Sequence, residues 1–232
     1  MFHLAHNNYN YMKLFLNSFF LVILLLCGPV YSEDFYKEFV VKVSGIKIGK
    51  LSWSVKIDET NYFNQLKLKS EGLLSGLYRF NGEYSSEGKV INKKLKPLKY
   101  NHLWKTKKIE KNMKLVFENN KLNSLHQKPN ETEKLRINVY DVEESKDPLT
   151  SFLQIVLGET SSLVVDGRRI YTMNSFLDKE SYETTIEISN YVNLWADHKR
   201  NKFEKITFEK EGRLFFPKKI NIYFDGKVFN LE

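Results

Sequence analysis

Three histidines beyond residue 32 are the residues best suited to acid–base or metal chemistry: His102, His126 and His198. They lie far apart, and no two have the spacing of a metal-binding motif. Asp197 precedes His198, but neighbours on a strand point to opposite faces, so we interpret them as a surface pair. Motifs of serine hydrolases, dinucleotide-binding proteins and P-loop proteins are missing from the sequence. The sequence therefore favours a noncatalytic protein without metal or other cofactor, over an unrecognised hydrolase of envelope polymers.

Two charged groups have simpler structural interpretations. Glu143, Glu144 and Asp147 precede an expected helix, where acids cap N–H groups and favour the helix dipole. The run from Asp166 to Arg169 could bind an anion, but a turn with exposed cations is the favoured interpretation.

Aromatic residues are the remaining candidates for a binding site. Phe, Tyr and Trp make up 14% of the chain, and many fall on apolar rows of expected strands. They could fill a closed core, or line a groove between sheet and helix that takes an acyl chain or another apolar ligand. The candidate ligand-binding residues are Trp53, Tyr78, Phe80, Phe117, Phe152 and Val156.

Alternating apolar and polar residues predict strands along most of the chain. Residues 51–57, "LSWSVKI", alternate strictly, which places one row on a core and the other in water. Leu135, Ile137 and Val139 form a similar row, while the polar stretch "HQKPNETEK" before it suggests a long hairpin loop. Asp166-Gly167 and Asp225-Gly226 are favoured hairpin turns. We expect about a dozen strands.

One segment has helical spacing instead. Its apolar residues recur at three- and four-residue intervals, Asp147 can cap the N-terminus, Pro148 suits the first turn and Gly158 suits the end. We therefore predict a mainly β fold: a large curved antiparallel sheet or half-barrel, with one principal short helix over residues 148–157 packed on it.

The N-terminus has the pattern of a secretory signal peptide. Lys13 precedes thirteen mostly apolar residues over 14–26, and small residues precede a cleavage point after Ser32. Met12 could be the true start. We predict a signal peptide over 1–32, a single β-rich domain over 33–232 and a periplasmic location; a membrane anchor through 14–26 and a lipidated Cys27 are the alternatives.

The positive charge comes mostly from lysine. The formal net charge is +8, and nine lysines crowd one region: Lys93, Lys94, Lys96, Lys99, Lys105, Lys107, Lys108, Lys111 and Lys114. Because they alternate with apolar residues in an exported chain, we interpret them as a solvated sheet face and expect no nucleic-acid partner. Peripheral contact with an anionic membrane is an intermediate hypothesis.

Several segments taken in order resemble a known family. "SGIKIGKLSWSV", "LKPLKYNH", "DPLTSFLQIVLG", "VVDGRRIY" and "LFFPKKINIYF" are similar to the exported bacterial proteins grouped as domain of unknown function 3108, over about residues 35–231. The resemblance implies an exported or periplasmic protein and supplies no catalytic residues. At the level of fold alone, many antiparallel strands with one helix also resemble lipoprotein-carrier proteins, in which a curved sheet holds a lipid.

These observations favour a binding protein for a lipid or another apolar envelope component. The alternative is an envelope structural or assembly factor that contacts other proteins through an edge strand or the lysine-rich face.

Overall fold

The computed structural model describes residues 33–72, 75–76, 79–195, 203–210 and 215–232. Tyr78, Asp197, His198 and the whole predicted leader, residues 1–32, lie outside the described residues. Within the described part, the chain forms one antiparallel sheet of thirteen strands, the helix α2 (Pro148–Val156) and a short 3-10 helix, η2 (Val139–Asp141). The strands are β1 (Glu33–Val43), β2 (Ile46–Ile57), β3 (Asn61–Ser70), β4 (Phe80–Ile91), β5 (Lys94–Thr106), β6 (Glu110–Glu118), β7 (Lys121–Lys128), β8 (Ser161–Val165), β9 (Arg169–Leu177), β10 (Glu183–Asn193), β11 (Phe203–Glu209), β12 (Lys219–Phe224) and β13 (Lys227–Leu231).

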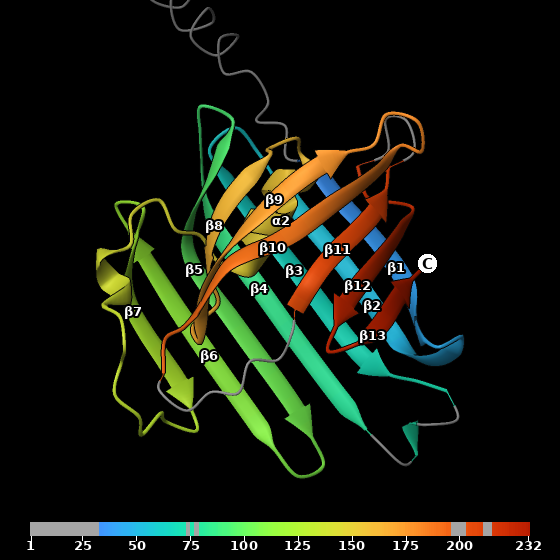
Figure 1. Cartoon of the computed structure of the whole chain (residues 1–232), viewed down its shortest axis with the longest axis horizontal. Helices are drawn as coiled ribbons and strands as arrows, with labels where there is room; N and C mark the ends of the chain where they lie inside the picture. The colour runs from blue at the N-terminus through green and yellow to red at the C-terminus, as the bar shows by residue number, and fades with distance from the viewer. Residues whose placement is uncertain (1–32, 73–74, 77–78, 196–202, 211–214) are drawn as a thin grey trace, which may run out of the picture. The chain divides into compact units, whose positions relative to one another are not determined.

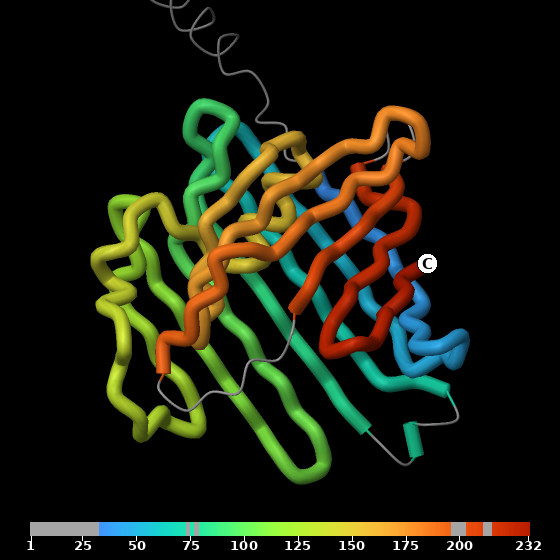
Figure 2. The backbone as a smooth tube through the Cα atoms, in the orientation of Figure 1, coloured from blue at the N-terminus to red at the C-terminus, as the bar shows by residue number. Residues whose placement is uncertain are grey.

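The sheet consists of two meanders. The chain passes from the edge strand of the first meander, β7, through η2 and α2 to the edge strand of the second, β8. Strands β1 to β7 pair in order, strands β8 to β13 pair in order, and β13 pairs with β1. That pairing sets Val41 opposite Leu231, with backbone hydrogen bonds of 2.7 and 3.2 Å between Val40 and Glu232. The sheet curls so that β8–β10 pass over α2 and face β3–β5 on its other side (Figures 1 and 2).

Two-residue turns with positive φ join several of the hairpins. Asn92 and Lys93 have φ of 52° and 63°, and Asp225 and Gly226 have φ of 52° and 72°. Such turns match the right-handed twist of the strands, and asparagine, aspartate and glycine adopt them at the lowest cost. The predicted turn at Asp225-Gly226 is confirmed.

The segment between β7 and α2 covers both edges of the sheet. Glu143 forms an isolated bridge with Lys121 of β7, and Lys146 forms one with Val164 of β8. The backbone N–H of Lys146 donates to Leu163 at 2.9 Å. One segment therefore pairs with both edge strands, and each bridge occupies part of an edge that could otherwise pair with another chain.

The predicted fold class is confirmed, as is the position of its helix. Asp147 is the N-cap of α2 and Pro148 begins the helix, which extends to Val156. Gly158 follows with a φ of 113°, a conformation that glycine adopts readily and that ends the helix. None of the helices in the described part has the length and apolar character needed to cross a bilayer.

The expected strand over Leu135, Ile137 and Val139 is wrong. Leu135 forms only an isolated bridge, with Trp195, and Val139 begins η2. The alternation arose because Ile137 and Val139 both pack on a hydrophobic cluster that includes Leu115 and Phe117 of β6, while the chain around them pairs with no strand. The stretch "HQKPNETEK" ends β7 and leads to η2 and α2, so it is not a hairpin loop.

Candidate functional site

A buried polar network holds the first turn of α2 against β3 and β4. One oxygen of Asp147 accepts hydrogen bonds from the N–H groups of Leu149 and Thr150, both at 2.9 Å. The other accepts from the hydroxyls of Thr150 at 2.5 Å and Ser86 at 2.8 Å. The Tyr62 hydroxyl lies 2.6 Å from that of Thr150. Burial raises the pKa of the Asp147 carboxyl and of the Tyr62 hydroxyl. Because these groups are buried and satisfy one another, the network anchors the helix and is poorly suited to catalysis.

Asn64 extends this network to the aromatic residues of the interior. Its side-chain oxygen accepts from the indole N–H of Trp53 at 2.8 Å, and its amide donates to the carbonyl of Leu149 at 3.1 Å. All of these bonds are buried, so they fix the Trp53 ring relative to α2.

Trp53 is the centre of an aromatic cluster beneath α2. Its ring is stacked on Phe152 with centroids 5.4 Å apart, and lies 4.8 Å from Phe216. Phe152 also meets Phe208 edge-to-face at 6.0 Å. Val156, one turn along the helix, is buried in the same hydrophobic cluster. The structure thus brings together three of the predicted ligand-binding residues: Trp53, Phe152 and Val156.

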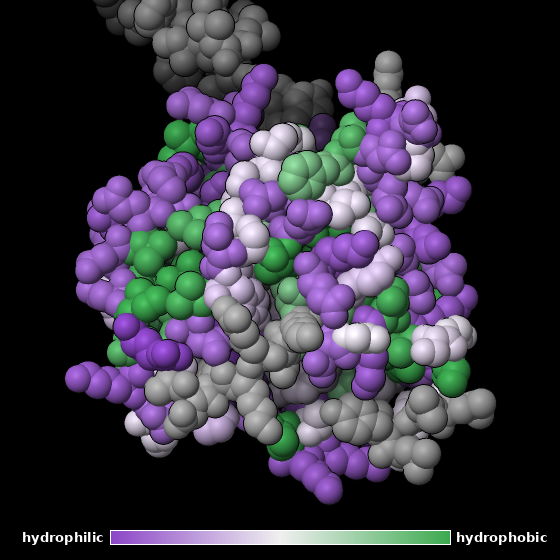
Figure 3. All heavy atoms as spheres, in the orientation of Figure 1, coloured by the Kyte–Doolittle hydropathy of each residue, from purple (hydrophilic) through white to green (hydrophobic). Residues whose placement is uncertain are grey.

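The other predicted ligand-binding residues lie apart from this cluster. Phe117 is buried in a second cluster with residues of β5 to β7. Phe80 is stacked on Trp104 with centroids 5.4 Å apart, at the start of β4. Tyr78 lies outside the described residues. On the face drawn in Figure 3, apolar side chains gather beside the segment over residues 129–147, where partly buried members of the second cluster lie.

The helix α2 contacts only part of the inner face of the sheet. Its main contacts are with β8, β5, β3 and β4. A helix of nine residues is ~14 Å long, whereas β2 and β4, of twelve residues each, span ~40 Å. Several inner-facing residues on other strands, or in the loop before β12, pack on the hydrophobic cluster that contains Trp53 but stay only partly buried: Phe35, Phe203, Phe215, Ile222 and Phe229.

The two described histidines lie on opposite faces of the sheet. His102 pairs with Met113, which is buried, so both side chains face the interior. His126 pairs with Lys114 and is exposed. A site built on both rings is therefore excluded by geometry. Among the described residues, no group of three His, Cys, Asp or Glu side chains is arranged to hold a metal ion.

The turn between β8 and β9 differs from the expectation of exposed cations. Asp166 accepts hydrogen bonds from the N–H groups of Arg168 and Arg169 at 2.8 and 2.7 Å, which confirms a turn. However, both arginines are only half-exposed, and Arg169 lies over the Tyr191 ring, 5.2 Å from its centroid. Burial raises the pKa of Asp166, and the two arginines oppose this shift. The turn faces the interior because Gly167 is seated against Met113 of β6.

The lysine-rich region is mostly a solvated face, with Lys111 as an exception. Lys105 forms an exposed ion pair with Glu110 at 2.8 Å, and Lys99 lies 3.5 Å from Glu87. Lys111 pairs with Trp104 on the inner row and is half-buried. Burial and the nearby Arg168 lower its pKa. Because Lys111 faces the interior, the interpretation as a solvated face is wrong for it.

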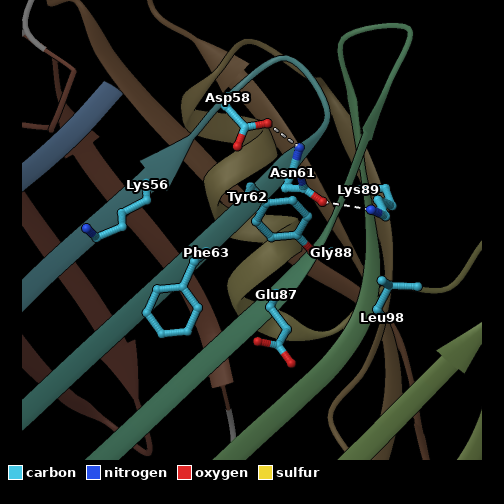
Figure 4. A pocket seen from close by; sticks show the side chains of 9 residues that line it. All are labelled: Lys56, Asp58, Asn61, Tyr62, Phe63, Glu87, Gly88, Lys89 and Leu98. Atoms are coloured by element: carbon cyan, nitrogen blue, oxygen red, sulfur yellow. Dashed lines mark hydrogen bonds between the residues drawn. The ribbon is translucent and has the colours of Figure 1, made fainter. Parts of the chain in front are cut away.

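A shallow pocket of about 360 Å³ opens at the ends of β2, β3 and β4 (Figure 4). Asn61 donates its backbone N–H to Asp58 at 2.7 Å and accepts from Lys89 at 2.8 Å through its side chain. Glu87 and Lys56 complete a charged rim. These charged and hydrogen-bonded groups suit a surface turn, so we assign no apolar ligand to this pocket.

The sequence matches the model of a family described as "Protein of unknown function (DUF3108)" over residues 38–194. The chain belongs to this family. A comparison with curated proteins finds no match. Among solved structures, the chain is similar to the crystal structure of a beta-barrel-like protein of domain of unknown function DUF1849 from Brucella abortus. The two share 10% identity over 88% of this chain and 95% of that one, with a TM-score of 0.48.

Sequence reasoning missed the polar members of the interior. Asn64 and Ser86 both occupy inward positions in otherwise apolar rows, and both are fully buried. A polar residue in such a row indicates a hydrogen-bonded partner across the core, and this signal was available in the sequence. The partner itself, the start of α2, depends on how the sheet curls.

Proposed function

We propose that this DUF3108 protein is an exported, noncatalytic protein of the cell envelope that binds a lipid or another apolar envelope component. The ligand would lie against the partly buried aromatic residues around the Trp53 cluster, on the inner face of the sheet: Phe35, Phe152, Phe203 and Phe229. The predicted signal peptide supports export to the periplasm, and the family description is compatible with a protein of unknown activity.

The observation that carries the proposal is that α2 is much shorter than the strands and contacts only part of the inner face of the sheet. The short α2 has its main contacts with β3, β4, β5 and β8, while aromatic side chains of β1, β11 and β13 stay partly buried around the same cluster. Closed cores bury such rings almost completely, since each contributes a large apolar area. Partly buried inner aromatics are the surface that an acyl chain would cover.

Lipid extraction tests this proposal directly. Protein purified from its native envelope should release a reproducible amphiphile, identified by mass spectrometry, at close to one molecule per chain. The delipidated protein should then bind a fluorescent fatty acid and show a higher melting temperature with it. Protein that carries no lipid, and that does not bind the probe after delipidation, would rule out the carrier hypothesis.

The exposed tip of the β9–β10 hairpin favours a second candidate, an envelope assembly factor. Phe176, Leu177 and Tyr182 are exposed at 56%, 59% and 69%. Clustered apolar side chains on a surface often mark a protein contact. Replacing Phe176 and Leu177 with serine should then abolish crosslinks to envelope proteins in cells and leave the fatty-acid affinity unchanged. Crosslinks that persist in this variant would contradict the second candidate.

A further inference from the structure

Two basic side chains lie near each other on the inner face of β5 and β6. In this ladder His102 is opposite Met113, and Trp104 is opposite Lys111. Residues directly opposite in an antiparallel pair share a face, and so do alternate residues along a strand. His102 and Lys111 are therefore diagonal neighbours in the interior.

Arg168 approaches the same place from the other layer of the sheet, and its charge acts on both His102 and Lys111. The turn that carries it is fixed, because Gly167 is seated so closely on Met113 that a Cβ there would lie 2.1 Å from the Met113 sulfur. The indole N–H of Trp195 donates to the Gly167 carbonyl at 3.2 Å, and the backbone N–H of Leu194 donates to Arg168 at 2.8 Å. Figure 1 shows this turn, between β8 and β9, in front of β5 and β6.

These basic groups are poorly compensated. In the described part of the chain, no carboxylate forms an ion pair with Lys111 or Arg168, and the buried Nε2 of His102 has no hydrogen-bond partner. The nearby acid, Asp166, attracts Arg168 without forming an ion pair with it, and it also accepts two backbone N–H groups. The Tyr84 ring covers one side of His102, with centroids 4.4 Å apart. Burial, with Arg168 and Lys111, lowers the pKa of His102 to about 4.

A continuous inner row joins this basic cluster to the aromatic cluster. The pairings run from Trp53 to Leu66, from Leu66 to Tyr84 and from Tyr84 to His102, across β2, β3, β4 and β5. Three strand spacings correspond to ~14 Å. An acyl chain can span that distance along the row, with its polar end at His102.

We propose that His102, Lys111 and Arg168 bind the anionic head group, a carboxylate or a phosphate, of an amphiphile whose tail lies along the row toward Trp53. This inference rests on the proposed function and adds the chemistry of the ligand to it. Lys111 and Arg168 supply charged donors, and His102 becomes a third donor when the bound anion favours its protonated form. The anion would neutralise a cluster that is otherwise unfavourable in a partly buried position.

Binding of three probes tests the proposal: a fluorescent fatty acid, its methyl ester and inorganic phosphate, each titrated against the delipidated protein at pH 7. The fatty acid should bind about ten- to hundred-fold more tightly than its ester, as expected for charge-assisted hydrogen bonds. Arg168→Gln and Lys111→Met should remove most of this preference. Lys114→Met is the matched control, because Lys114 is exposed on the same strand, and it should retain the preference.

The outcomes separate this inference from the proposed function. Equal affinity for acid and ester, unchanged in Arg168→Gln, would overturn the head-group site and leave the apolar site standing. Phosphate binding without fatty-acid binding would support the basic cluster and contradict the carrier function, whereas binding of no probe would contradict both.

Melting temperatures show whether the variants are folded. Lys111→Met should not lower the melting temperature, because it removes an uncompensated cation; a lowered value would indicate a structural role and contradict the assignment.

Discussion

Asp147 is the residue on which the position of α2 depends most directly. It is fully buried and accepts four hydrogen bonds, from Leu149, from Thr150 twice, and from Ser86. Asp147→Ala removes the N-cap and leaves several buried donors without a partner, so we expect it to lower the free energy of unfolding by about 3–4 kcal/mol. Asp147→Asn keeps one acceptor oxygen and should lose less. Denaturant melts of both variants measure the difference.

Asp58 provides the control for this comparison. It also accepts two backbone N–H groups, from Thr60 and Asn61, but in an exposed turn. Asp58→Ala should therefore have a much smaller effect than Asp147→Ala. Equal losses in the two variants would show that the buried network contributes nothing beyond the capping bonds.

His102 should make stability depend on pH. Its pKa is about 4 in the folded protein and 6.5 ordinarily, so between these values the unfolded chain binds a proton that the folded protein does not. The stabilisation is complete above pH 6.5 and is lost as the pH falls toward 4, by up to roughly 3 kcal/mol. His102→Gln should abolish this part of the pH dependence in denaturant melts. The exposed His126, changed to Gln, should leave it intact; an unchanged pH profile in His102→Gln would refute the assignment.

At the scale of elements, features that depend on adjacent residues were predictable, whereas features that depend on the packing of distant elements were not. The cap at Asp147 and the turn at Asp225-Gly226 depend on residues adjacent in sequence, and both were predicted correctly. The partial burial of Arg168 was not, because it depends on β6 passing beneath the β8–β9 turn. Alternation at Leu135 to Val139 predicted a strand that does not form, since alternating burial also occurs in a segment that covers a sheet edge without joining it.

The helix provides a direct test of whether the aromatic cluster is open. Phe152 is only partly buried, whereas its neighbour Leu153 is fully buried. Leu153→Ala should therefore cost about 2–5 kcal/mol, as in a closed core, and Phe152→Ala should cost less than the 3–5 kcal/mol of a buried phenylalanine. Fatty-acid affinity should fall in Phe152→Ala and stay unchanged in Leu153→Ala, measured where both are folded. A full core penalty for Phe152→Ala, in a protein that binds no probe, would make α2 a structural plug.

At the scale of the whole sheet, the two meanders are joined by the pairing of β1 with β13, which are the most distant strands in the sequence. Among the described strands, eleven of the twelve pairings join neighbours in sequence, which hairpin patterns can indicate, but β1 and β13 are separated by nearly the whole described chain. Alternation alone predicted the inward row around Trp53 but not that Phe216 would lie against it, because that contact requires the second meander to fold back over α2. The candidate site forms only when the β1–β13 pairing brings the two meanders together. The sequence therefore predicted individual aromatic residues of the site but not which of them are in contact.

Removal of the predicted leader should leave this closure intact. The most N-terminal described pairing sets Glu33 of β1 opposite Ile57, and β1 makes its contact with β13 further along, at Val41 to Val43. If the protein is exported as proposed, we expect it to begin at Glu33, and a chain starting there should match the full chain in its denaturant melt. N-terminal sequencing of protein from the periplasm measures the first point, and the two melts measure the second. An intact leader, or a lipid linked to Cys27, would instead identify a membrane-anchored protein, and the head-group site would then act at the membrane surface.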